Sequence, residues 1–174
     1  MFDRSLPLAL LMGSVIAFAG VTTAHAQSIA KATLENSDGD PAGSVTFTEA
    51  ANGVLITAEL RNLKVGAHGF HIHETGACES DFSSAGDHFN PDGKEHGFDN
   101  PNGYHAGDLP NIFVANDGIV KFHVFTSRVS LGDGSNSILD DDGSAVIVHA
   151  DPDTYLAKAG AGGRVACGVI SAVP

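Results

Sequence analysis

The feature that most constrains how this chain can fold is a pair of histidines, His71 and His73, in the apolar run Gly69–His73. Polar residues that alternate with apolar ones predict a β-strand. Successive side chains of a strand point to opposite faces, so both imidazoles share one face, about 6–7 Å apart. Five further candidate ligands follow along the chain: His88, His96, His105, Asp108 and His149. Imidazole suits copper and zinc, and we interpret the chain as a scaffold that gathers these ligands.

Short alternating runs separated by Gly, Asn and Asp predict an all-β fold. Val45 and Phe47 alternate with threonines, and Asn52-Gly53 is a hairpin signal before the next run. Eight strands are expected, at residues 29–35, 45–48, 54–60, 65–73, 112–115, 119–125, 145–149 and 164–170. The first four follow one another across short turns, which favours an antiparallel sandwich or barrel. At 174 residues the chain is long enough for one domain with its own core.

Two stretches lack periodicity, Glu74–Pro110 and Asp151–Gly163. A loop as long as the first is unusual in a compact domain unless it is functional or held in place. It carries three histidines and one aspartate of the candidate set, and a bound ion would offset the entropy cost of ordering it. Four such ligands suit a closed, structural zinc site: His88, His96, His105 and Asp108. The alternative is that these are solvated loop residues.

The remaining histidines of the set, His71, His73 and His149, lie in expected strands or at a strand end. Three or four imidazoles without a carboxylate suit copper in a near-planar arrangement, and copper supplies one-electron chemistry that zinc lacks. By contrast, His123 lies opposite the apolar face of its strand and is expected to be a surface residue. No Ser-His-Asp spacing, phosphate-cradling Gly loop or paired-carboxylate cleft stands out in the sequence.

The N-terminal segment, residues 1–26, has the pattern of a cleavable signal peptide. A weakly positive start precedes the apolar stretch Leu8–Val21, and Ala24-His25-Ala26 fits a small-x-small cleavage site before Gln27. A membrane anchor is the alternative, but the stretch is short for a ~30 Å hydrocarbon core. We therefore expect a mature domain of residues 27–174 that has no membrane span and is exported, most simply into a bacterial periplasm.

Cys78 and Cys167 both lie in the expected mature domain. In an oxidising compartment they most simply pair with each other, and two buried free thiols are the alternative. A disulfide would close a loop of about ninety residues and stabilise the fold by about 4–5 kcal/mol on the chain-entropy model. The formal net charge of −12 argues against nucleic acid as a partner, because nucleic acid recruits basic surfaces.

Several sequence blocks together resemble copper-zinc superoxide dismutase of the bacterial secreted type. They are Gly69–His73, Gly86–Pro91, Lys94–Gly97, His105–Asn111 and Gly163–Ile170. The blocks occur in the family's order with its ligand spacings intact, and the resemblance covers essentially all of residues 29–170. It implies an eight-stranded antiparallel Greek-key β-barrel or sandwich, immunoglobulin-like, with two long functional loops. It also implies an enzyme that converts two superoxide anions and two protons to dioxygen and hydrogen peroxide.

The resemblance also implies roles for residues of this chain, with one copper and one zinc per subunit. Copper, cycling between Cu(II) and Cu(I), would be bound by His71, His73, His88 and His149. Zinc would be bound by His88, His96, His105 and Asp108. His88 would bridge the two ions as an imidazolate and act in catalysis with Arg164, which would hold the superoxide anion. Asp153 would join a copper-bound histidine to a zinc-bound one.

The resemblance further implies that Cys78 and Cys167 form the family's disulfide and that His68 supports the framework. The chain departs from the family pattern at two places. Asp87 replaces the glycine that usually precedes the bridging histidine, which sets a carboxylate near the metals. The second loop is short and carries one charge, Lys158, after residue 153, whereas the family's longer loop carries mixed charges credited with steering superoxide. We therefore expect a rate that depends on salt less steeply than in the eukaryotic enzymes of this family.

Two other functions compete with this one. The first is a non-catalytic periplasmic copper and zinc binder, against which Arg164 argues, because a metal buffer needs no anion clamp. The second is a two-metal hydrolase, which fits poorly because such sites usually bridge their metals with carboxylates or water. On the enzyme interpretation the partner is superoxide and the role is protection of the cell envelope. The quaternary state stays open between a monomer and a homodimer.

Overall fold

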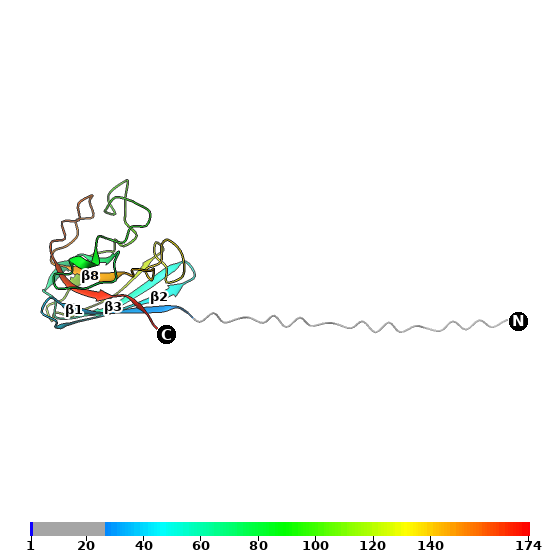
Figure 1. The fold of residues 1–174 in the computed structure, drawn as a ribbon, viewed down its shortest axis with the longest axis horizontal. Coiled ribbons are helices and arrows are strands. Elements are labelled where there is room, and N and C mark those ends of the chain that lie inside the picture. Colours follow the sequence, from blue (N-terminus) through cyan, green and yellow to red (C-terminus); the bar gives the residue numbers. More distant parts are fainter. Residues whose placement is uncertain (2–26) are drawn as a thin grey trace.

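Antiparallel β-strands form the framework of the protein, whose computed structural model describes residue 1 and residues 27–174 (Figure 1). The expected signal peptide, apart from its first residue, lies outside the described residues. The strands are β1 Ile29–Asn36, β2 Pro41–Ala50, β3 Gly53–Leu60, β4 Gly66–His68, β5 Phe70–His73, β6 Ile112–Val114, β7 Val120–Thr126, β8 Ala145–His149, β9 Arg164–Val169 and β10 Ser171–Ala172. In this part of the chain the one helical element is the 3-10 turn η1, Ser83–Ala85, and no helix is long and apolar enough to cross a membrane.

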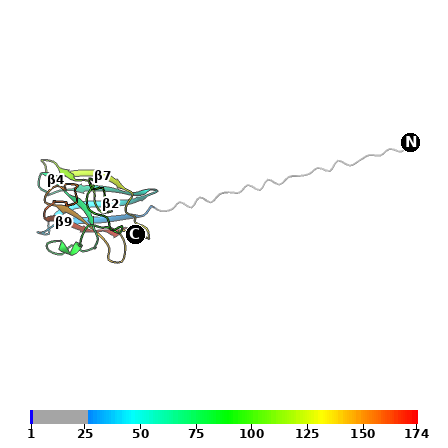
Figure 2. The same cartoon turned by 90° about the horizontal axis from the view of Figure 1, so that it is seen from above.

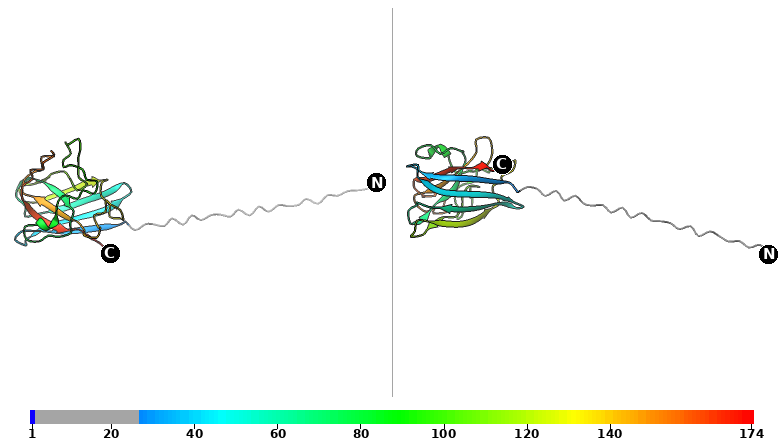
Figure 3. Two further views of the ribbon diagram at one scale, coloured as in Figure 1. Left: turned by 45° about the horizontal axis from the view of Figure 1, so that its top comes forward. Right: turned by 90° about the horizontal axis from the view of Figure 1, so that it is seen from below.

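An 8-stranded sheet has the order β5-β8-β9-β1-β2-β3-β7, with β10 paired to β1. This order leaves the sequence order after β3, because β7 pairs with the free edge of β3 and β9 returns beside β1. Such long-range returns define a Greek-key arrangement. The sheet curls (Figure 2, Figure 3). A separate two-stranded ribbon of β4 and β6 is linked to both edge strands of the sheet, because β4 runs into β5 and β6 packs against β7. The expected Greek-key all-β fold is therefore confirmed.

The alternating sequence pattern places the core as expected. In β3, Val54, Ile56, Ala58 and Leu60 are buried, while the residues between them are exposed or half-buried. Phe47 of β2 is also fully buried. Burying a large apolar side chain of this kind stabilises the fold by about 1.5–3 kcal/mol.

The segment expected as one strand at residues 65–73 forms two strands, because Gly69 interrupts it. The Gly69 N–H donates to the Asp151 carbonyl at 2.9 Å, and the Gly69 carbonyl accepts from the His149 N–H at 2.8 Å. A Cβ at position 69 would lie 3.0 Å from the Cβ of Ala161, so this close approach favours glycine. Together with β10, the break raises the expected eight strands to the ten observed.

Strand β5 is buried on both faces. Phe70 and Ile72 point into the barrel core, so the alternating His71 and His73 occupy the opposite face. The long loop between β5 and β6 covers that face, and its Gly107 carbonyl accepts from the Ile72 N–H at 3.0 Å. This loop and the one between β8 and β9 project from the same side of the barrel (Figure 1). The histidines therefore lie between the barrel wall and the loops.

A disulfide joins Cys78, at the start of the first long loop, to Cys167 in β9, with a Cα–Cα distance of 5.8 Å. The pairing expected from the sequence is confirmed, and residues 27–174 hold no free cysteine. Around the bridge, Phe82, Ala85 and Ile147 form a small apolar cluster outside the barrel core. The disulfide thus attaches the first loop to β9, which is separated from the histidine strand β5 by β8.

Candidate metal centre

Four imidazoles meet on the outer face of β5. Their ligand atoms all lie within 4.8 Å of one another: His71, His73, His88 and His149. Strand β5 supplies two of the rings, the end of β8 supplies one, and the first loop supplies His88, which forms an isolated bridge with His73. The ring of His71 lies 4.1 Å from that of His88 and 4.9 Å from that of His149, measured between centroids. The structure therefore brings together all the histidines expected to hold copper.

Four nitrogens of this group are buried without a hydrogen-bond partner among residues 27–174. One of them, His71 Nε2, lies 2.8 Å from the Asp153 carboxylate, and three have no such contact: His71 Nδ1, His73 Nε2 and His149 Nε2. An unpaired buried polar atom costs about 1–3 kcal/mol, and a cation bound among these three nitrogens would satisfy all of them. The second nitrogen of His73, Nδ1, lies 2.9 Å from the Gly86 carbonyl. A donor hydrogen bond at Nδ1 leaves the lone pair on Nε2 free for an ion. The donor set thus fits a metal that favours imidazole, such as copper.

The protonation of these rings suits metal binding. Burial lowers the pKa of His73 to about 2 and that of His149 to about 3. Burial also lowers the pKa of His71, against the opposing effect of the Asp153 carboxylate. The three rings are therefore neutral at neutral pH, which is the form that coordinates a metal.

A second group consists of His88, His105 and Asp108, whose ligand atoms again lie within 4.8 Å of one another. Asp108 Oδ1 is 2.7 Å from His88 Nδ1 and 3.3 Å from His105 Nδ1. Burial alone would raise the pKa of Asp108, but its contacts with the two histidines and with the Gly97 N–H hold the pKa well below its usual range. A charged carboxylate together with imidazoles is a donor set that fits zinc.

His96, expected as the fourth zinc ligand, is placed differently from the other three. Its Nε2 lies 2.9 Å from Asp153 Oδ2 and 3.7 Å from Asp108 Oδ1, and its Nδ1 lies 2.6 Å from the Leu156 carbonyl. Both nitrogens therefore face oxygen atoms. The close group that contains His96 is the one with His71 and Asp153.

The Asp153 carboxylate links the two groups. Its Oδ2 lies 2.8 Å from His71 Nε2 and 2.9 Å from His96 Nε2. Burial would raise the pKa of Asp153, but the contact with His71 and the N–H of Tyr155 lower it. The carboxylate stays charged and fixes the orientation of two rings, one from strand β5 and one from the first long loop.

Arg164, the first residue of β9, lies next to the four-imidazole group of His71, His73, His88 and His149, which we call the copper-type group. Its guanidinium donates to two carbonyls of the first loop, that of Phe82 and, at 2.6 Å, that of Gly86. The Gly86 carbonyl also contacts His73 Nδ1, so the arginine and this histidine share an anchor. The neighbouring Asp87 is exposed, and its N–H donates to Glu74 Oε1 at 3.1 Å.

Two further histidines lie where the sequence analysis expected them, and two residues that contact Asp153 were not predicted. His68 uses both nitrogens on the backbone carbonyls of His149 and Lys64, as a framework residue does, and His123 is exposed. Sequence reasoning did not single out Asn111 or Tyr155, which bind Asp153 directly. Asn111 ends one of the blocks that carry the family resemblance, and this was the available signal for it.

The outer face of this Greek-key β-barrel holds two groups of candidate ligands, one made of imidazoles alone and one that includes a carboxylate. One histidine belongs to both groups. These features together define a class of two-metal β-barrel proteins. Residues 41–170 match the family model described as copper/zinc superoxide dismutase. The chain belongs to this family and is an oxidoreductase, with copper and zinc as the family's cofactors.

Curated relatives and solved structures agree with this assignment. The chain is 46% identical over 147 residues to a Cu-Zn superoxide dismutase of Caulobacter vibrioides, a match that covers 81% of this chain and 84% of the relative. It is 43% identical over 146 residues to Cu-Zn superoxide dismutase 2 of Aquifex aeolicus, covering 81% of this chain and 85% of the relative. The crystal structure of a SOD-like protein from Bacillus subtilis is 41% identical, with a TM-score of 0.77 and coverage of 80% of this chain and 96% of that one.

Proposed function

We propose that this protein dismutates superoxide outside the cytoplasm, converting two superoxide anions and two protons to dioxygen and hydrogen peroxide. The observation that carries the proposal is the set of unpartnered, buried nitrogens on His71, His73 and His149 that converge beside the ring of His88. Neutral imidazoles without a carboxylate suit copper. Arg164 beside them adds a fixed positive charge for a small anion.

In this proposal two residue sets hold the metals. Copper is held by His71, His73, His88 and His149. Zinc is held by His88, His96, His105 and Asp108. His88 belongs to both sets because its Nδ1 faces Asp108 while its ring packs against His71 and His73. To join the zinc set, His96 would have to give up one of its two oxygen contacts.

When bound, copper supplies reversible one-electron transfer and zinc supplies fixed positive charge. Arg164 binds and orients superoxide. Its two contacts with loop carbonyls fix the guanidinium, so little order has to be gained when the anion arrives.

His88 holds and moves a proton. Since its Nδ1 faces Asp108, Nε2 is the atom directed to the copper-type group. We assign to Nε2 a proton that is taken up in one half of the cycle and given to the reduced anion in the other. One superoxide loses an electron and becomes dioxygen, and the other gains that electron and two protons and becomes hydrogen peroxide.

Two observations support a location outside the cytoplasm. The disulfide between Cys78 and Cys167 is of a kind that persists in oxidising compartments. The N-terminal segment has the pattern of a signal peptide that is cleaved near Ala26-Gln27. In a bacterial periplasm the enzyme would protect the cell envelope from superoxide. Sequencing the N-terminus of the exported protein tests this part of the proposal.

The test of the activity combines metal analysis, copper EPR and a superoxide-consumption assay on metal-loaded protein. Arg164→Ala is expected to lower kcat/KM at least about tenfold with metal content unchanged, since a charge-assisted anion contact is lost. Arg61→Ala, which removes an exposed arginine elsewhere on the barrel, is the matched control and should leave the rate intact. Loaded protein that binds both metals and consumes no superoxide would instead be a metal-binding protein.

A further inference from the structure

A closed ring of hydrogen bonds surrounds Asp153 and involves Asn111 and Tyr155. The Asn111 amide pairs with both backbone groups of Asp153: Oδ1 accepts from its N–H at 2.8 Å, and Nδ2 donates to its carbonyl at 2.9 Å. The Asn111 backbone N–H donates to the Tyr155 hydroxyl at 2.7 Å. The Tyr155 backbone N–H donates to Asp153 Oδ1 at 2.6 Å, which completes the ring.

Tyr155 is itself held on several sides. Its φ of 63° lies in the left-handed region, which a bulky residue adopts only when its surroundings require it. Its carbonyl accepts from the Asp99 N–H at 2.9 Å, and its ring centroid lies 5.2 Å from that of Phe98. Gly97 makes the close approach possible, because a Cβ there would lie 2.3 Å from the Tyr155 carbonyl oxygen. The residue therefore joins the two long loops.

We propose that Asn111 and Tyr155 are positioning residues that hold the Asp153 carboxylate where it contacts both His71 and His96. This inference rests on the proposed function, because those two rings belong to the two metal sets. Asp153 is 5% exposed and lies in a loop rather than a strand. Since the ring ties its backbone to Asn111, immediately before β6, the barrel determines where its carboxylate lies.

The consequence for the metals follows from what the carboxylate does. Oδ1 is occupied by the Tyr155 N–H, so Oδ2 alone is left for His71 and His96, at 2.8 and 2.9 Å. A carboxylate that contacts the far nitrogen of a ligating histidine fixes the ring and its tautomer, and removing such a partner commonly costs about 10–100-fold in metal affinity. Asn111 and Tyr155 act one step further out, so a smaller effect is expected.

The chain offers a matched pair of variants, because its two tyrosines both pack against Phe98. Tyr155→Phe removes the hydroxyl that accepts from Asn111. Tyr104→Phe removes a hydroxyl that makes no hydrogen bond within residues 27–174, and it keeps the ring that lies under Arg128. Asn111→Ala removes the other half of the ring. Asp153→Asn is the positive control.

The experiment measures the zinc release rate into a chromophoric chelator and the copper EPR spectrum of the loaded full-length mature protein. Tyr155→Phe and Asn111→Ala should each speed zinc release about fivefold and alter the EPR parameters, as expected for the loss of neutral hydrogen bonds. Tyr104→Phe should match the parent protein. In the double variant Tyr155→Phe/Asn111→Ala, the increase in the zinc release rate should be smaller than the product of the two single-variant increases, because both changes open the same ring.

The outcomes separate this inference from the proposed function. Parent protein that fails to bind the two metals would overturn the proposed function. Parent protein that binds both, with Tyr155→Phe and Asn111→Ala releasing zinc at the parent rate and giving the parent spectrum, would overturn the positioning role alone. Lower thermal stability of the variants with unchanged release and spectrum would likewise show that the ring is merely structural.

Discussion

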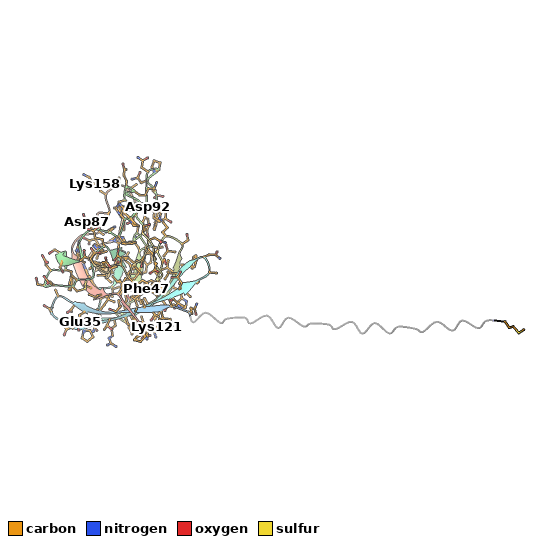
Figure 4. All side chains as sticks on the ribbon, turned by 45° about the vertical axis from the view of Figure 1, so that its right-hand side comes forward. Glu35, Phe47, Asp87, Asp92, Lys121 and Lys158 are labelled. Atoms are coloured by element: carbon orange, nitrogen blue, oxygen red, sulfur yellow. A yellow bond between two sulfur atoms is a disulfide. The ribbon has the colours of Figure 1, made fainter. Side chains whose placement is uncertain are left out.

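Asp87 places a carboxylate directly before His88 in the sequence. It stands between Gly86, whose carbonyl anchors Arg164, and His88, which belongs to both candidate metal groups. Its side chain is exposed on the loop side of the barrel, the side on which Lys158 also lies (Figure 4). An acidic group there opposes the approach of an anion that Arg164 attracts.

Replacing Asp87 by asparagine is therefore expected to raise kcat/KM for superoxide about twofold at low ionic strength, the effect of one exposed, solvent-screened charge. Pulse-radiolysis or stopped-flow rates check this. The matched control is Asp117→Asn, since Asp117 is equally exposed but lies in the turn between β6 and β7. An Asp87→Asn rate equal to or below the parent rate would mean that this carboxylate does not affect the approach of substrate.

At the scale of elements, alternation predicted which face of β5 holds His71 and His73, because side-chain period is a local property of a strand. The break at Gly69 was not predictable, since the Asp151 carbonyl that replaces its strand pairing lies far along the chain. For the same reason sequence could propose His96 as a ligand but not its contact with Leu156, and it missed Asn111. The identity of a candidate ligand can be read from the local sequence. Its hydrogen-bond partners depend on how two loops that are far apart in the chain come together.

The element that depends most on one covalent bond is the first long loop. The disulfide between Cys78 and Cys167, separated by 89 residues, attaches it to β9, and Phe82 and Gly86 of this loop anchor Arg164. Replacing both cysteines by serine is expected to lower the free energy of unfolding by about 2–5 kcal/mol. It should also lower kcat/KM, because the arginine loses its fixed frame.

Urea unfolding of the parent and the double variant measures the first effect, and the superoxide assay at matched metal content measures the second. Parent protein treated with a reductant serves as the control and should approach the variant. A variant that unfolds at the parent urea concentration would show that the non-covalent cluster around Phe82 is enough to hold the loop.

For the whole molecule, the long-range field and the local field at the site have opposite signs. The formal net charge is −12, which repels superoxide at a distance, whereas Arg164 and Lys158 attract it nearby. Figure 4 shows Asp87 and Asp92 on the same side as Lys158, so the loops themselves carry both signs of charge. Salt screens both fields, and at 0.15 M the Debye length is only about 8 Å.

Because screening weakens the repulsion and the attraction together, kcat/KM should change less than about twofold between roughly 0.01 M and 0.15 M ionic strength. Lys158→Gln sharpens the test: it removes local attraction and leaves the net repulsion, so its rate should be lower at low salt and should rise as salt is added. Both profiles are measured by the superoxide assay in a series of sodium chloride concentrations. A parent rate that falls steeply over this range would mean that positive charge near the site dominates the field, and that the acidic surface has no influence on how substrate arrives.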